Sequence, residues 1–197
     1  MINWYRAVSL ILTIVASSML STPVAWAHSF NVALIIPDTP EGRDIRDGFM
    51  LATTERDSHP DEHSDGHLGG LDVYVTVIEV TGQKAGDIGQ LVRQGQIEIV
   101  APFGSGEMLS EIIKILEGRG VVLLSPGTTP FSRPDLPGVA AFLSAYEKAY
   151  GTSPSPEAAE GYNAARRIDQ AVRPLEGVDD LEALRRSFTE TRHEMTW

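Results

Sequence analysis

The 197-residue sequence contains no cysteine. This absence excludes disulfide bonds, cysteine-ligated zinc sites and thiol-based catalysis. Basic residues are also few, since 16 Lys and Arg stand against 27 Asp and Glu and give a formal net charge of −11. Because an acidic surface repels phosphate backbones, we expect no nucleic-acid partner.

Recognisable catalytic motifs are also missing. Gly104-Ser105-Gly106 is not a nucleophile elbow, no lysine follows a glycine run as in a phosphate-binding loop, and His193–Trp197 does not have the spacing of a zinc-protease helix. No histidine is expected near Ser105 to activate it as a nucleophile. The sequence therefore predicts a protein that is not an enzyme and that carries no cofactor.

The longest apolar run lies close to the N-terminus. Arg6 precedes an almost unbroken apolar stretch from Ala7 to Leu20, and Ala25-Trp26-Ala27 follows. This order is typical of a secretory signal peptide that is cleaved after Ala27. The run is shorter than the ~20 residues that cross a bilayer, which favours cleavage over a membrane anchor. We therefore expect residues 1–27 to be a signal peptide and residues 28–197 to form one exported domain.

Short β-rich runs alternate with helical periodicity along the exported part. The predicted strands are residues 31–36, 71–80, 97–103 and 121–125, and the predicted helices are residues 44–55, 85–94, 107–116, 139–150, 157–172 and 179–189. Strands that alternate with helices of this length indicate an α/β fold with a doubly wound, mostly parallel sheet. An aromatic stripe of Phe142, Tyr146 and Tyr150 is expected to pack against that sheet.

A ligand of such a fold binds in the crevice at the carboxyl ends of the strands. Three loops are predicted there: residues 38–42, 104–106 and 126–129. The last two combine glycine, which lets a ligand approach the backbone, with hydroxyl side chains that donate hydrogen bonds. Residues 104–106 also open a helix, where free N–H groups favour an anion such as a carboxylate. Glycine and serine are common in any strand-to-helix turn, so spacing alone does not decide between a site and an ordinary turn.

Four segments in order resemble the type I periplasmic binding proteins, the leucine/isoleucine/valine-binding receptors of ABC transporters. These segments are GRDIRDGFMLATTE (residues 42–55), VAPFGSGEMLSEI (residues 100–112), VVLLSPGTTP (residues 121–130) and residues 138–172 with FLSAYEKAYG and EGYNAA. The resemblance implies a periplasmic protein that binds a small solute and delivers it to an ABC permease.

Members of that family have two lobes that close over the ligand. Their chain leaves the first lobe after the segment similar to residues 121–130, builds much of the second lobe, and returns with helices similar to residues 138–172. In this sequence a short Pro-rich stretch, residues 130–137, stands in place of that excursion. The resemblance therefore implies that residues 28–197 form a single Rossmann-like lobe.

The family resemblance also implies which residues bind the ligand. In amino-acid-binding members the first lobe holds the ligand carboxylate through its Gly-Ser turn and its Ser-Pro-Gly-Ala-Thr loop. Carried over by position, the ligand-binding residues are Ser105, Gly106, Thr128 and Thr129. The implied ligand is an amino acid or a similar small carboxylate.

Two other functions compete with solute binding. The lobe could serve as a non-catalytic interaction module, because the loss of the second lobe would expose apolar surface at the strand ends and favour self-association or another periplasmic partner. A metal site is the other alternative, since His59, His63 and His67 lie among carboxylates. Pro60 and Gly66 interrupt a helix in that stretch, so a solvated loop is the favoured interpretation.

Overall fold

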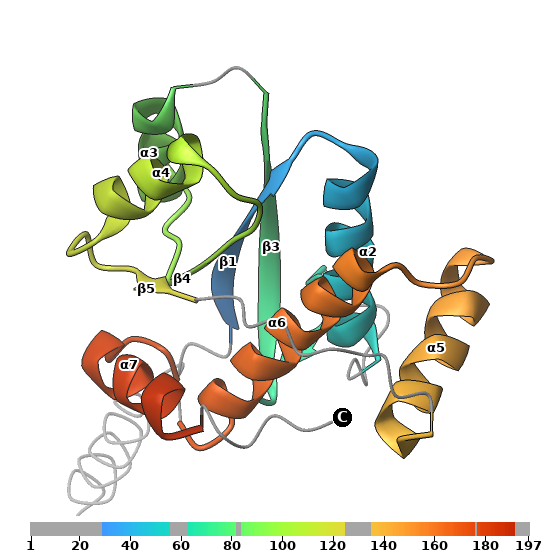
Figure 1. Ribbon diagram of the computed structural model, residues 1–197. Helices are drawn as coiled ribbons and strands as arrows, with labels where there is room; N and C mark the ends of the chain where they lie inside the picture. The colour runs from blue at the N-terminus through green and yellow to red at the C-terminus, as the bar shows by residue number, and fades with distance from the viewer. Residues whose placement is uncertain (1–28, 56–62, 82–83, 125–134, 176, 192–197) are drawn as a thin grey trace, which may run out of the picture.

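The computed structural model describes residues 29–55, 63–81, 84–124, 135–175 and 177–191 (Figure 1). In chain order the elements are β1 (Ser29–Pro37), α2 (Pro40–Thr54), β2 (His67–Leu68), β3 (Leu71–Val80), α3 (Ala85–Gln94), β4 (Ile99–Pro102), α4 (Glu107–Leu116), β5 (Val122–Leu123), α5 (Pro137–Tyr150), α6 (Pro156–Val172) and α7 (Leu181–Glu190). None of the described helices is long and apolar enough to cross a membrane.

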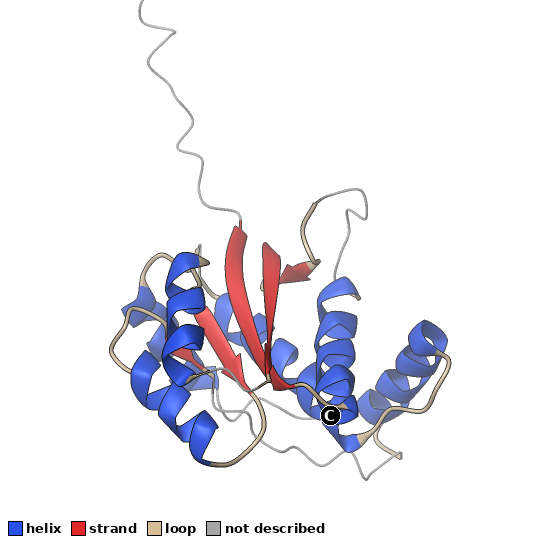
Figure 2. Ribbon diagram, turned by 90° about the horizontal axis from the view of Figure 1, so that it is seen from above, coloured by secondary structure: helices blue, strands red, loops and turns tan. Residues whose placement is uncertain are grey.

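The five strands form one sheet in the order β2-β3-β1-β4-β5. The pairs β1–β3, β1–β4 and β4–β5 are parallel, and only β2 runs antiparallel to its neighbour β3. Helices cover both faces of the sheet, as Figure 2 shows from above. This topology confirms the predicted doubly wound, mostly parallel α/β fold.

The central strand β1 divides the core into two halves. Phe30, Val32 and Leu34 belong to the half covered by α2 and α6, whereas Ala33 and Ile35 belong to the half covered by α3 and α4. Successive side chains of a strand point to opposite faces, so a strand buried on both faces must be apolar at every position. This requirement explains why β1 appears in the sequence as a continuous apolar run.

Helices α2 and α6 lie side by side although more than a hundred residues separate them in the chain (Figure 1). Two glycines allow their backbones to touch. A Cβ atom on Gly48 would lie 1.8 Å from the carbonyl oxygen of Ala158, and one on Gly161 would lie 1.9 Å from the carbonyl oxygen of Ile45. The segment after the Pro-rich stretch therefore completes the helical layer over β1.

The aromatic stripe of α5 contacts helices. Phe142 lies with its ring centroid 4.7 Å from that of Tyr162 in α6, and the Tyr150 hydroxyl donates a 2.8 Å hydrogen bond to the carbonyl oxygen of Asp47 in α2. Phe142 and Tyr146 are buried, as a core stripe should be. The expected packing partner was wrong, because the stripe anchors α5 on the α2–α6 layer.

Burial, together with the nearby carboxylates of Asp44 and Asp47, raises the pKa of Tyr146 to about 12. In the unfolded chain the pKa of a tyrosine is about 10, so at higher pH the unfolded state ionises first. The resulting stability is complete below pH ~10 and is lost as the pH rises towards ~12. Because solvent screens part of this effect, we expect the free energy of unfolding to fall by about 1 kcal/mol between pH 10 and pH 11.5.

This decline should be flatter in a Tyr146→Phe variant, which keeps the ring and removes the ionisable group. Urea denaturation at several pH values measures it. Parallel declines in the variant and the wild-type protein would contradict the assignment to Tyr146.

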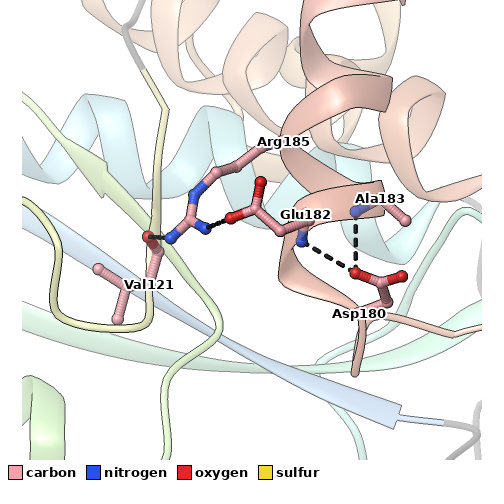
Figure 3. Close-up of polar contacts among 5 residues, drawn as sticks. All are labelled: Val121, Asp180, Glu182, Ala183 and Arg185. Carbon is pink, nitrogen blue, oxygen red and sulfur yellow. Dashed lines mark hydrogen bonds and ion pairs between the residues drawn. The ribbon is translucent and has the colours of Figure 1, made fainter.

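Helix α7 contacts the β5 edge of the sheet through Arg185, which reaches the residue before β5 (Figure 3). The Arg185 guanidinium donates to the carbonyl oxygen of Val121 at 3.1 Å and to the Glu182 carboxylate at 2.6 Å. Asp180 fixes the start of the helix, since its carboxylate accepts from the backbone N–H groups of Glu182 and Ala183, each at 3.0 Å. One edge of the sheet is thereby blocked to further strands.

Two local predictions need correction. Helix α2 begins at Pro40 rather than near residue 44, because the Thr39 side chain caps it by accepting from the N–H of Gly42. Strand β2 was missed, although Gly69 and Gly70 between two leucines are a hairpin signal. Both glycines have positive φ, 65° and 86°, as a two-residue hairpin turn requires.

Candidate functional site

A pocket of about 110 Å³ opens at the carboxyl ends of the strands. Its walls come from the ends of β1 and β3, the turn after β4, and one side of α4; the lining residues are Pro37, Val80, Phe103, Gly104, Ser105, Met108, Leu109 and Ile112. After β1 the chain enters α2 on one face of the sheet, and after β4 it enters α4 on the other. The pocket therefore lies at the topological switch point, where doubly wound folds bind ligands.

The turn after β4 leaves the N-terminus of α4 open. Gly106 is its N-cap residue, with φ 101° and no side chain to cap the helix. A positive φ of this size suits glycine and lets the chain turn sharply from Ser105 into the helix. The first backbone N–H groups of α4 thus lack a side-chain cap, and an anion at this end would be stabilised by the helix dipole.

The neighbouring helix α2 differs in this respect. Its N-terminus is capped by Thr39. The Glu41 carboxylate accepts hydrogen bonds from the backbone N–H of Glu41 itself and from the Thr39 side chain, and these bonds lower the pKa of Glu41. A carboxylate from the chain itself already occupies the start of α2. Of these two helices at the strand ends, α4 is the one whose N-terminus has room for an external anion.

The electrostatic surroundings of the pocket are not strongly favourable to an anion. No charged side chain is among its described lining residues. Glu107, the first residue of α4, is exposed, and Asp38 accepts a 2.9 Å hydrogen bond from the Thr81 hydroxyl across the loops that follow β1 and β3. Attraction for a carboxylate has to come from hydrogen bonds and the helix terminus.

The structure places one of the four expected ligand-binding residues in the wall of this pocket and a second directly after it in the chain. Ser105 lines it, and Gly106 follows at the start of α4, where both are exposed. Thr128 and Thr129 lie outside the described residues, which end on this side at Leu124. The N–H of Leu124 donates to the carbonyl oxygen of Val100 at 2.8 Å, so the pairing of this segment with β4 extends to the last described residue.

No known family model matches the chain, and no curated protein matches it. Among solved structures it aligns with an ABC transporter substrate-binding protein from Sphaerobacter thermophilus, at 12% identity and a TM-score of 0.48, over 81% of this chain and 85% of that one. It also aligns with a protein from Rhodospirillum rubrum described as a branched-chain amino acid ABC transporter, at 21% identity and a TM-score of 0.34, over 90% and 53% of the two chains.

A third solved structure is a branched-chain amino acid ABC transporter periplasmic ligand-binding protein from Burkholderia xenovorans LB400. The identity is 12%, the TM-score is 0.36, and the alignment covers 89% of this chain and 47% of that chain. The chain thus spans about half the length of these two branched-chain amino acid proteins. All three descriptions name the class that the sequence motifs resemble, but similarities of this size do not establish a function.

The three histidines do not assemble into a metal centre in the described residues. His63 is exposed, and Nε2 of His67 lies 2.7 Å from a carboxylate oxygen of Asp72 across the β2–β3 pair. His59 lies outside the described part of the chain. Within that part, no group of three or more histidines and carboxylates could hold a metal ion.

Sequence reasoning missed the apolar walls of the pocket. The sequence predicts a helix over residues 107–116 but does not identify Met108, Leu109 or Ile112 as pocket residues. Pro37 and Val80 end two different strands, and only the observed strand order shows that they meet. The signal available in the sequence was the position of Met108 and Ile112 one helical turn apart, directly after the Gly-Ser-Gly turn.

The expected apolar patch at the strand ends is not found in the described residues. Among all described residues, the large apolar side chains that are well exposed are Tyr74, Leu91 and Tyr150. None of them lines the pocket. The described strand ends therefore do not provide the apolar interaction surface that was predicted for a lobe without its second half.

Proposed function

We propose that the chain is a one-lobe solute-binding protein of ABC-transporter type that is exported to the periplasm after cleavage at Ala27. Its ligand is an amino acid or a similar small carboxylate. The carboxylate group binds at Ser105 and at the N-terminus of α4 beside Gly106, and Thr128 and Thr129 of the loop after β5 complete the site. The proposed partner is an ABC permease, and no catalytic step is involved.

One observation carries this proposal: the pocket and the uncapped helix α4 coincide with the segment VAPFGSGEMLSEI. The same residues that resemble the family's third strand and turn form the wall of a pocket at the topological switch point. The hydroxyl of Ser105 and the free N–H groups of α4 supply hydrogen-bond donors for a carboxylate, while Phe103, Met108 and Ile112 offer an apolar wall to the rest of the ligand.

The size of the pocket limits its affinity. Sites that enclose a drug-sized ligand measure roughly 300–1,000 Å³ and bury most of its surface. A volume of about 110 Å³ receives only part of an amino acid. Charge-assisted hydrogen bonds are worth roughly 1.5–3 kcal/mol each, and the immobilisation of a ligand costs about 4 kcal/mol or more. Two or three such bonds barely exceed that cost.

We therefore expect the purified protein to bind free amino acids with dissociation constants of about 1 mM or weaker. NMR chemical-shift titration with a panel of amino acids measures this affinity and should show shifts at residues 103–109. A Ser105→Ala variant should bind several-fold more weakly, whereas Ser144→Ala, on the exposed side of α5, should bind like the wild-type protein.

Micromolar binding by a proven monomer would contradict the half-site argument. Titrations in which no amino acid shifts any residue of the pocket would contradict solute binding itself and would favour the interaction module. Equal affinities of Ser105→Ala and the wild-type protein would show that a ligand binds elsewhere.

Glu107 offers a second test of the anion site. Its carboxylate directly follows Gly106 at the start of α4, where it stabilises the helix but repels a bound carboxylate. A Glu107→Gln variant should bind carboxylate ligands roughly two- to fivefold more tightly, since Glu107 is exposed and two like charges about 4 Å apart in water repel by about 1 kcal/mol. Titration of the variant with an amino acid and with the corresponding amide measures this effect. Equal gains for both ligands would contradict an electrostatic origin.

A further inference from the structure

The two edges of the sheet are not equivalent. At one edge β5 is only two residues long, and Arg185 of α7 donates to the carbonyl oxygen of Val121 (Figure 3). At the other edge β3 is ten residues long and is paired with β1 along Asp72–Val80. Its outer side is paired with β2 only at Leu71 and Asp72.

Hydrogen bonds beside β2 show which groups of β3 face outwards. The N–H of Val73 donates to the carbonyl oxygen of Gly66, its carbonyl oxygen accepts from Asp65, and the N–H of Val75 donates to the Asp65 carboxylate, all at 2.8–2.9 Å. Backbone groups of successive residues in a strand point to opposite sides. The odd-numbered residues therefore face outwards, and the even-numbered residues bond to β1.

The outward groups further along β3 are open. These are the carbonyl oxygen of Val75 and both the N–H and the carbonyl groups of Val77 and Glu79. None of them has a hydrogen-bond partner in the described part of the chain. An exposed row of unpaired donors and acceptors is a template for another strand.

The side chains of this edge do not protect it. Proteins commonly block open edges with lysine, proline or a bulge. Residues 73–80, VYVTVIEV, contain no lysine or proline, and Glu79 is their one charged residue. The regular register of β3 with β1 from Asp72 to Val80 shows no bulge. The segment is rich in β-branched residues, which favour a paired strand.

We propose that the β3 edge pairs antiparallel with the β3 edge of a second copy of this chain, with Val77 opposite Val77 across a twofold axis. In this register the N–H of each Val77 donates to the carbonyl oxygen of the other. The N–H of each Glu79 donates to the carbonyl oxygen of the opposite Val75. The pairing stops at Val75, because the Asp65 carboxylate already occupies its N–H.

A second copy suits this edge better than an unrelated strand for two reasons. A twofold axis matches every open donor of the segment with an open acceptor of the same segment, so no additional sequence is needed. Growth also ends at two chains, because the β5 edge of each copy is covered by α7. The result is a closed dimer with one continuous sheet.

Side chains support the register with Val77 at the axis. Thr76 would lie opposite Ile78 of the second copy, on the stretch of β3 that lies beyond Asp65. Aromatic and β-branched residues form favourable cross-strand pairs. Glu79 lies opposite Val75, whose N–H is bound by the Asp65 carboxylate, so two carboxylates approach each other at each end of the pairing.

The absence of cysteine makes a direct test available. A Val77→Cys variant places the only two thiols of the dimer opposite each other at about 5.5 Å between Cα atoms, which suits a disulfide. Mild oxidation should convert most of this variant to a covalent dimer. The control Thr189→Cys carries its thiol on the exposed side of α7 and should remain largely monomeric.

Light scattering and sedimentation of the wild-type protein should show a dimer whose association strengthens with salt, because each chain is strongly acidic. Val77→Pro removes an outward N–H and spares the bonds to β1, so it should weaken association at least tenfold with little change in melting temperature. A Val77→Pro dimer as tight as the wild-type dimer would overturn the proposal.

Amide hydrogen exchange covers the case in which the proline variant does not fold. In the wild-type protein the N–H groups of Val77 and Glu79 should become protected as the protein concentration rises. Fast exchange of both groups at every concentration, or a monomer at millimolar concentration and high salt, would also overturn the proposal.

Discussion

Replacing Gly161 with alanine should lower the free energy of unfolding by about 3 kcal/mol or more, the upper range of overpacking in a well-packed core. The new Cβ would lie 1.9 Å from the carbonyl oxygen of Ile45 and 2.8 Å from its carbon. These are backbone atoms of α2, so no side chain can rotate away, and the helices must separate along their whole crossing. For a chain of this size the melting temperature should fall by roughly 6–12 °C.

The effect belongs to the helix crossing and not to alanine as such. Gly48→Ala should behave like Gly161→Ala, because its Cβ would lie 1.8 Å from the carbonyl oxygen of Ala158. Gly86→Ala is the matched control: this glycine lies in α3 with no atom within 4 Å of the added Cβ. Helix propensity predicts that Gly86→Ala stabilises the protein by up to about 1 kcal/mol. Thermal unfolding of the three variants measures the difference. Equal melting temperatures of Gly161→Ala and Gly86→Ala would contradict the close backbone contact between α2 and α6.

The glycines at this crossing give a physical reason for two of the motifs. Gly48 lies in the segment GRDIRDGFMLATTE, and Gly161 lies in the segment EGYNAA, which returns after the Pro-rich stretch. Each motif needs a glycine because the other helix lies against it. Helix α6 therefore belongs to the same folding unit as α2, and this packing supports the proposal that the retained segments form one lobe.

The order and type of most elements could be predicted from the sequence because they depend on local patterns. Strand β3 and helix α3 were predicted with the bounds that the structure shows, Leu71–Val80 and Ala85–Gln94. Alternating β-branched residues determine the first, and a strong apolar face determines the second. The start of α2 was misplaced although Thr39 and Pro40 carry a local signal for it. The hairpin at Gly69 and Gly70 was also missed, although these two glycines are a local signal for it.

The rest depends on contacts between segments that are distant in the sequence. An aromatic stripe in α5 has the same pattern whether it packs on a sheet or on helices, so the contacts of Phe142 with Tyr162 could not be inferred. The pocket likewise needs the strand order, because Pro37, Val80 and Ser105 come from three separate strand ends. Only the position of Ser105 in a strand-to-helix turn was predictable. Which sheet edge is covered depends on where α7 docks, and Arg185 gives no sign of that in the sequence.

The two proposals concern different parts of β3, its carboxyl end and its outer edge. Its carboxyl end contributes Val80 to the pocket, and its outer edge provides the open hydrogen-bonding groups of Val77 and Glu79.

The hairpin that leads into β3 is anchored by one buried carboxylate. Asp169 of α6, whose side chain is 7% exposed, accepts a 2.8 Å hydrogen bond from the N–H of Gly69 and pairs with the Arg173 guanidinium at 2.7 Å. Gly69 itself fits closely against α6, since an added Cβ would lie 2.6 Å from the side chain of Val172. Asp169 thereby connects the β2–β3 turn to the helical layer.

Asp169→Ala should lower the free energy of unfolding by about 1–3 kcal/mol, because it leaves the N–H of Gly69 without its acceptor at a part-buried site. Asp169→Asn keeps an acceptor oxygen of the same shape and should cost only about 1 kcal/mol. Arg173→Ala should cost less than about 1 kcal/mol, since the Arg173 side chain is 61% exposed and its ion pair is screened by solvent. Urea denaturation of the three variants measures this order, and amide exchange should show that Val73 and Val75 lose protection first in Asp169→Ala. If Arg173→Ala were as damaging as Asp169→Ala, the stabilisation would come from the ion pair, and the proposed anchor of the β3 edge would be wrong.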